Sequence, residues 1–227
     1  MRRIAGVLRH PRSTMAALVA AQSWFPTWIW MFILALWLVP AGWFLSTATG
    51  QLALVDERVR QVEAFGGRVD DARYDALLQR PPWDAYFLSG GRVLLLPPIT
   101  VLVAAALVAL ARLDGAPLPI AGGLAVSVHA SVPLAVQQLI ATPVSYLTES
   151  LASPTNLAAA LRLENGTLGS RLFGAIDLFG LWWVWLLAVG LSAATARPAR
   201  EYLVRLVLIY AGIAAALAAA MTLAGGS

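Results

Sequence analysis

The side chains of this sequence that could carry chemistry lie inside long apolar stretches. Asp177 is the one carboxylate in such a stretch, near the start of FGAIDLFGLWWVWLLAVGLS, residues 173–192. A carboxylate at the centre of a bilayer costs about 2.5–3.5 kcal/mol on insertion scales, and less near an interface. A second stretch, IAGGLAVSVHASVPLAVQQLIA, residues 120–141, holds the other polar candidates, which are Ser127, Ser131, His129, Gln137 and Gln138.

Three interpretations of these polar groups stay open. They form hydrogen bonds between helices, worth about 0.6 kcal/mol each on average; they bind an ion, a proton or a small ligand; or they serve catalysis. A step of two residues turns a helix by about 200°, so His129 points away from both Ser127 and Ser131. That direction opposes the geometry that a nucleophile and its base require. We favour structural hydrogen bonds and expect no catalytic residue.

The depth of each polar group along its helix indicates which of them can meet. Counting the rise per residue places His129 too far from Asp177 for a hydrogen bond, and Gln137 and Gln138 at a similar depth to Asp177. Polar groups also occur around the whole circumference of the 120–141 stretch. We therefore expect this helix to be surrounded by other helices rather than by lipid.

Composition excludes several classes of function. The chain has 227 residues, of which 59% are hydrophobic and 12% are charged. Soluble proteins have about a quarter of their residues charged. The mean hydropathy of the chain is +0.74. It has no cysteine and two histidines, and it lacks the HExxH, GxSxG and phosphate-loop motifs. All sixteen basic residues are arginines, and they are dispersed rather than gathered in a basic stripe. We expect a membrane protein that is not an enzyme, with no metal, no cofactor and no nucleic-acid partner.

Five apolar runs are long enough to span a bilayer, which takes roughly 20 helical residues. The sequence predicts an all-α integral membrane protein, a bundle of five transmembrane helices with a short amphipathic helical outer loop. Small residues at four-residue spacing in the last run, Gly212, Ala216 and Ala220, suit close helix packing. The predicted spans are about 28–48, 93–111, 120–141, 175–195 and 206–224.

The remaining segments complete one membrane domain over residues 1–227. Residues 1–23 form a basic amino terminus, and residues 49–92 form a loop with an amphipathic helix over QLALVDERVRQVEAF and a short helix over DARYDALLQ. In the 142–172 connection we expect a helix capped by Ser153, with Pro154 at its first position.

Arginines next to the span ends favour an orientation. Eight arginines fall on each side of the membrane, but those in the amino terminus precede the first span, which usually dominates topology. We expect the amino terminus in the cytoplasm and the carboxyl terminus outside, in a bacterial cytoplasmic (inner) membrane.

The stretch at 173–198 resembles the fourth span of bacterial members of the Yip (Ypt-interacting protein) domain family, in which an Asp and an aromatic residue precede a Trp, leucines and Gly-Leu. The 120–141 stretch is similar to that family's Ser-x-x-Pro region, at Ser131 and Pro133 or nearby. The matching positions of the fourth span are Asp177, Phe179, Trp182, Gly190 and Leu191.

The resemblance implies five spans and an inside amino terminus. Eukaryotic relatives are associated with Rab-type GTPases and vesicle traffic, and bacterial ones largely lack an assigned activity. This sequence lacks the Asp-Leu-Tyr-Gly-Pro-type segment of the eukaryotic members, so GTPase binding is not carried over. Our leading hypothesis is a non-enzymatic membrane scaffold that binds membrane lipid, other membrane proteins or a second copy of itself. The alternative is a small transporter or channel that uses the polar residues of spans three and four.

Overall fold

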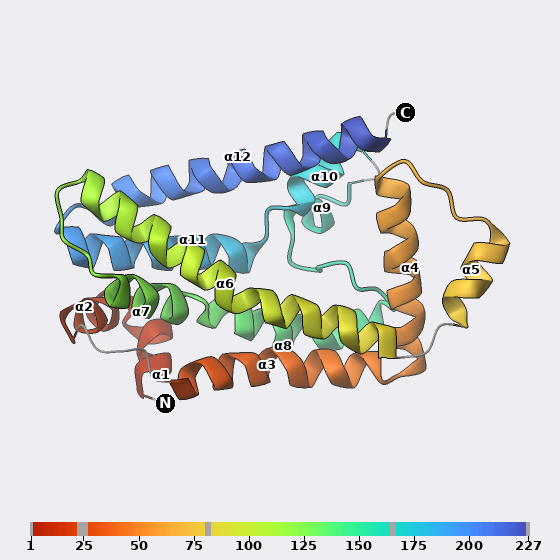
Figure 1. Ribbon diagram of the computed structural model, residues 1–227, viewed down its shortest axis with the longest axis horizontal. Coiled ribbons are helices and arrows are strands. Elements are labelled where there is room, and N and C mark those ends of the chain that lie inside the picture. The colour runs from red at the N-terminus through yellow and green to blue at the C-terminus, as the bar shows by residue number, and fades with distance from the viewer. Residues whose placement is uncertain (1, 22–26, 80–82, 164–166, 226–227) are drawn as a thin grey trace. The chain divides into compact units, whose positions relative to one another are not determined.

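The computed structural model describes residues 2–21, 27–79, 83–163 and 167–225 (Figure 1). These residues form an all-α protein, as the sequence predicts. The helices are α1 Arg2–Arg9, α2 Pro11–Ala21, α3 Thr27–Leu45, α4 Ala48–Ala64, α5 Asp71–Leu78, α6 Trp83–Leu113, α7 Ile120–Ala130, α8 Val132–Leu147, α9 Leu157–Ala160, α10 Leu168–Gly174, α11 Leu178–Thr195 and α12 Ala199–Gly225.

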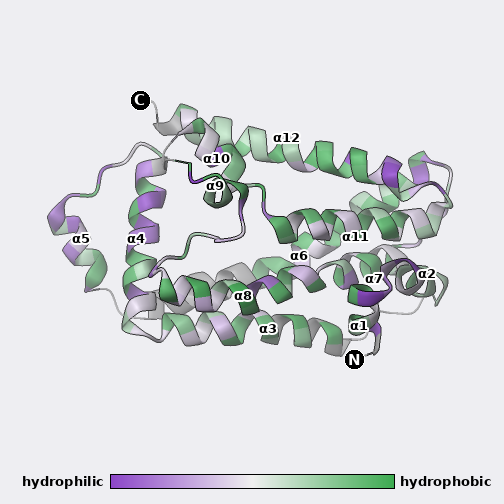
Figure 2. Cartoon of the chain, turned by 180° about the vertical axis from the view of Figure 1, so that it is seen from behind, coloured by the Kyte–Doolittle hydropathy of each residue, from purple (hydrophilic) through white to green (hydrophobic). Residues whose placement is uncertain are grey.

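Four helical segments in the described residues are long and apolar enough to cross a membrane, and a bent pair gives a fifth if it counts as one span. The bent pair joins 35–45 of α3 to 48–63 of α4 at 97°. Figure 2 colours most of α3, α6, α11 and α12 as hydrophobic. The four unbent segments are Leu94–Leu113, Ile120–Leu147, Leu178–Thr195 and Ala199–Leu223.

The bend after α3 has a local cause. Thr47 caps α4, since its hydroxyl oxygen accepts from the backbone N–H of Gly50 at 3.0 Å and donates to the carbonyl of Phe44 at 2.7 Å. A Cβ on Gly50 would lie 2.0 Å from that same carbonyl oxygen, so only glycine fits the turn. The helix of the first predicted span, α3, therefore ends at Leu45, before the predicted end near residue 48.

The predicted third span consists of α7 and α8, which meet at Ser131. Pro133 has no N–H to donate to the carbonyl of His129, which interrupts the helical ladder at this point. At the same junction, the Ser131 hydroxyl donates to the carbonyl of Ser127 at 2.9 Å. Over half of this span, 56%, is buried, the largest share among the four unbent segments. The prediction that other helices surround this stretch is confirmed for α7, where residues 125–130 are all buried. It does not hold along all of α8, where Leu139 and Ile140 are about half exposed.

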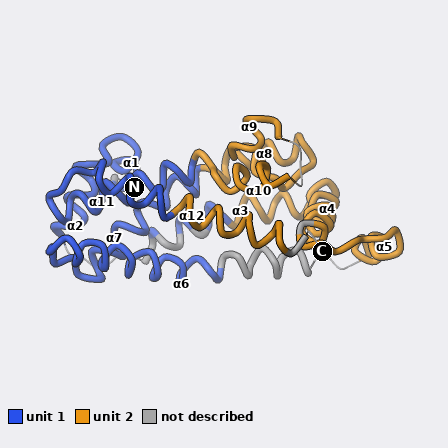
Figure 3. The backbone as a smooth tube through the Cα atoms, turned by 90° about the horizontal axis from the view of Figure 1, so that it is seen from above, with its two compact units in different colours: residues 1–37, 92–136, 179–209 blue, residues 38–91, 137–178, 210–227 orange. Residues whose placement is uncertain are grey.

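Contacts divide the chain into two compact units (Figure 3), of which unit 1 contains residues 1–37, 92–136 and 179–209. Within unit 1, α1 packs against α2, and both pack against α7. Its apolar core draws on α1, α2, α6, α7, α11 and α12, through buried side chains that include Val7, Met15, Leu107, Val126, Leu186, Leu191 and Tyr202.

Unit 2 contains residues 38–91, 137–178 and 210–227. The two helices predicted in the polar segment after the first span are present as α4 and α5, although residues 80–82 of that segment lie outside the described residues. Asp70 caps α5 by accepting from the N–H of Arg73 at 2.9 Å. Figure 2 shows hydrophilic residues concentrated on α4 and α5.

Candidate functional site: a polar cluster around Asp177

Asp177 lies immediately before α11 rather than inside it. The helix begins at Leu178, three residues after the predicted start of the span, because the preceding backbone is paired with residues 155–157. The N–H of Leu157 donates to the carbonyl of Ile176 at 2.8 Å, and the N–H of Leu178 donates to the carbonyl of Thr155 at 3.1 Å. This short antiparallel bridge fixes the backbone on both sides of the carboxylate.

The loop that faces Asp177 differs from its prediction. The helix that follows is α9, and its cap is Asn156, whose side chain accepts from the N–H of Ala159 at 2.7 Å. The prediction that Ser153 caps a helix is therefore wrong. Because the chain is extended at Asn156 and paired with Asp177, the helix begins later, and the Ser153 hydroxyl is left to bind a side chain.

The carboxylate of Asp177 accepts two hydroxyl donors at one oxygen. Its Oδ2 lies 2.8 Å from Ser153 Oγ and 2.5 Å from Thr155 Oγ1. The amide of Gln137, from α8, in turn donates to Thr155 Oγ1 at 3.0 Å. All four side chains are half-buried. Hydrogen bonds to a charged acceptor are shorter and stronger than neutral ones, and a chain of donors polarises its members further.

This arrangement anchors a loop. The hydroxyls of Ser153 and Thr155 donate to the carboxylate of Asp177, and Gln137 of α8 donates to Thr155. These donors converge on the residue immediately before α11. The chemical consequence is a fixed connection between three parts of unit 2.

The structure brings only one other predicted site residue into hydrogen-bond contact with this cluster. Gln137 reaches Asp177 through Thr155, and Gln138 is half-buried next to it on α8. The rest of the predicted set, Ser127, His129 and Ser131, belongs to unit 1.

Within unit 1, the ring of His129 is completely buried. Its Nδ1 lies 2.8 Å from the carbonyl oxygen of Ala125, one helical turn earlier. Ser131 bonds to its own helix in the same way, so these groups belong to the interior of the span.

The other positions of the resemblance pack α11 in unit 1. Phe179 and Leu191 are buried, and the rings of Phe179 and Trp182 lie 6.2 Å apart. A Cβ on Gly190 would lie 2.2 Å from a methyl group of Val126 on α7, so glycine permits the close approach of these two helices. Pro133 is also fully buried.

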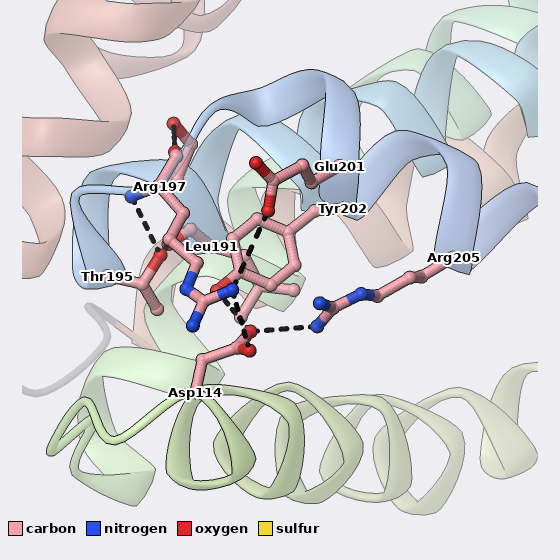
Figure 4. Close-up of polar contacts among 8 residues, drawn as sticks. Asp114, Leu191, Thr195, Arg197, Glu201, Tyr202 and Arg205 are labelled. Carbon is pink, nitrogen blue, oxygen red and sulfur yellow. Dashed lines mark hydrogen bonds and ion pairs between the residues drawn. The ribbon is translucent and has the colours of Figure 1, made fainter.

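A second polar cluster, in unit 1, was missed by the sequence interpretation (Figure 4). Asp114, in the turn after α6, accepts from the hydroxyl of Tyr202 at 2.7 Å and from Arg205 at 2.9 Å, and pairs with Arg197 at 3.3 Å. Its side chain is only 7% exposed. The partners are 83 or more positions away in the sequence, which local spacing does not connect. One signal was available: Asp114 is the only acid between Asp84 and Glu149.

The contacts of Asp114 lead us to expect that the thermal stability of the protein depends on pH. The hydrogen bond from Tyr202, helped by Arg205 and Arg197 against the effect of desolvation, lowers the pKa of Asp114 below its ordinary 3.8. The stabilisation from a lowered carboxyl pKa is complete above pH 3.8 and is lost as the pH falls through the folded-state value. We expect the midpoint of thermal unfolding of Asp114→Asn to lie below that of the wild type near neutral pH. The gap should narrow on acidification below 3.8, and a gap independent of pH would contradict this assignment.

The comparisons with known proteins give one match. The sequence model of the Yip1 domain matches residues 5–223, nearly the whole chain. No curated protein and no solved structure is significantly similar.

Proposed function

The chain belongs to the Yip1 domain family, and from this premise we propose that it is a non-enzymatic membrane scaffold that binds other membrane proteins or lipid. In this proposal residues 1–227 form one membrane domain in the cytoplasmic (inner) membrane of a bacterium. The amino terminus is cytoplasmic and the carboxyl terminus is outside, and GTPase binding is not carried over from the eukaryotic relatives.

Charge supports the proposed orientation. Each side carries eight arginines, and the positive-inside rule gives acids little weight. The arginines placed inside lie in short segments next to span ends, and four of them precede the first span, which usually dominates topology.

The observation that carries the scaffold proposal is the exposure of α12. Only 11% of this candidate span is buried, and Leu208, Ile213 and Leu217 are each more than half exposed. A Cβ on Gly212 would meet nothing within 4 Å. Gly212, Ala216 and Ala220 form an exposed row on this helix, whereas Ala214 and Ala218 on its other side are buried. In a membrane such a face contacts lipid or another membrane protein, and small residues allow a second helix to approach closely.

Site-specific photocrosslinking in native membranes tests this proposal. A photoreactive residue at Ala216, which is exposed, should give adducts of protein size, either with other membrane proteins or with a second copy. The matched control is Ala218, two positions away on α12 and 2% exposed, which should give none. Adducts with lipid alone from Ala216 would contradict a scaffold for proteins.

A small transporter or channel is the second candidate. Two buried polar atoms of α7, Ser127 Oγ and His129 Nε2, have no hydrogen-bond partner among the described residues, and polar groups inside a span often mark a substrate path. The two candidates differ in whether the reconstituted protein moves a solute.

A further inference from the structure

Helices α1 and α2 in unit 1 line a small cavity that is open to the surface. Its volume is about 270 Å³, and it is lined by Arg3, Ser13, Thr14, Ala17 and Leu18. The helices come this close because Gly6 has no side chain: a Cβ there would lie 2.6 Å from Thr14 Oγ1. A single residue, His10, joins the two helices, and Pro11 suits the first position of α2.

We propose that this cavity binds the phosphate group of an anionic lipid headgroup. A guanidinium presents a planar set of donors that matches phosphate oxygens, and the hydroxyl of Thr14 adds a further donor. Arg3 is exposed and Leu18 is buried, so the lining combines a cation at the surface with an apolar wall. Ser13 Oγ donates its hydrogen to the carbonyl of His10 at 3.1 Å, so Ser13 shapes the cavity and Thr14 supplies the hydroxyl donor.

The charge of unit 1 favours an anion at this place. The first acid in the sequence is Asp56, so no carboxylate lies among residues 1–55. Unit 1 holds nine arginines and two acids, Asp114 and Glu201. Both acids pair with arginines in or just before α12. The positive charge of Arg3 therefore has no acid of unit 1 left to neutralise it.

The packing of α1 and α2 favours a lipid as the source of the phosphate. Val7, Met15 and Leu18 bury their side chains in the core of unit 1, and both helices pack against α7, part of a candidate span. Helices with one apolar face and arginines on the other lie at the headgroup level of a membrane. This inference goes beyond the scaffold role, because the cavity would bind a headgroup whether or not a protein partner exists.

Native mass spectrometry of the full chain tests the proposal. The protein is released from mild detergent that contains equal amounts of phosphatidylglycerol and phosphatidylcholine. We expect the wild type to retain phosphatidylglycerol, and Arg3→Gln to bind it about tenfold more weakly, since one charge-assisted contact is lost. Gly6→Ala should weaken binding as well, because it displaces the Thr14 hydroxyl. The control is Arg200→Gln, an exposed arginine of unit 1 that does not line the cavity.

A second arm, with inorganic phosphate in place of phosphatidylglycerol, separates the two sources. Retention of the lipid that depends on Arg3 and resists competing phosphate supports a headgroup site. Equal binding of phosphate, with the same dependence on Arg3, supports the phosphate site and rejects the lipid as its required source. Unchanged retention in Arg3→Gln, or an equal loss in Arg200→Gln, would overturn the proposal.

Discussion

Replacing Gly190 with alanine will destabilise the protein by about 1–3 kcal/mol, the usual cost of overfilling a packed core. The added Cβ would lie 2.2 and 3.0 Å from the two methyl groups of Val126 and 3.2 Å from its Cβ. Val126 is fully buried and branched at Cβ, so it cannot turn away from the contact. The measurement is the free energy of unfolding in detergent, titrated with sodium dodecyl sulfate.

Two further variants make this prediction specific. Gly212→Ala introduces the same atom at a position where it meets nothing within 4 Å, and the better helix propensity of alanine should leave stability unchanged or raised by up to about 1 kcal/mol. Val126→Ala combined with Gly190→Ala should be less destabilised than the sum of the single variants, because the clash is removed. Additive effects would mean that α7 and α11 do not approach each other as described.

Replacing Asp177 with alanine will cost about 1–3 kcal/mol of stability, because the half-buried donors of Ser153 and Thr155 lose their acceptor. Asp177→Asn keeps an acceptor oxygen and loses the charge, so we expect a smaller loss of about 1 kcal/mol. The same unfolding titration measures both variants.

Controls for Asp177 come from the cluster and from the surface. Thr155→Val removes one donor at nearly constant volume, and its effect should be smaller in the Asp177→Ala background than in the wild type. Asp75→Ala, at an exposed carboxylate on α5, should change stability by less than about 0.5 kcal/mol. An Asp177→Ala variant as stable as the Asp75→Ala control would refute the anchoring role.

Apolar length and local turn chemistry were sufficient to predict much of the fold. The run of apolar residues indicates each candidate span, and the polar groups of the third span correctly indicate that its first helix, α7, is buried. The short helix α5 follows from its own sequence, because Asp70 supplies the cap and Asp71 sits in the first turn, where a negative charge is favourable.

Hydrogen bonds that bend or delay a helix were not predictable from hydropathy. The break between α3 and α4 depends on the hydroxyl of Thr47 and on a close approach at Gly50. A mean hydropathy taken over a window of 20 residues does not register either of these two local features. The late start of α11 likewise depends on backbone pairing with residues 155–157, which lie in a separate loop.

The candidate site was predicted only in part, because some of its contacts join residues that are distant in the sequence. Asp177 and Gln137 were predicted to lie at similar depth, and they are linked through Thr155. Ser153 was assigned to a helix cap because its neighbour Pro154 suits a first helical position, and only the tertiary structure shows its hydroxyl on Asp177. Asp114 and its partner Tyr202, 88 residues apart, meet through helix packing that no local pattern encodes.

Solute flux through the purified, reconstituted protein tests the scaffold role most directly. Liposomes that contain the wild type or Asp177→Asn are compared with empty liposomes for ion current and for proton uptake. We expect both proteins to match the empty liposomes, because the polar groups around Asp177 hold the fold together and line no path. A current or proton flux in the wild type that Asp177→Asn abolishes would contradict the scaffold role and establish transport.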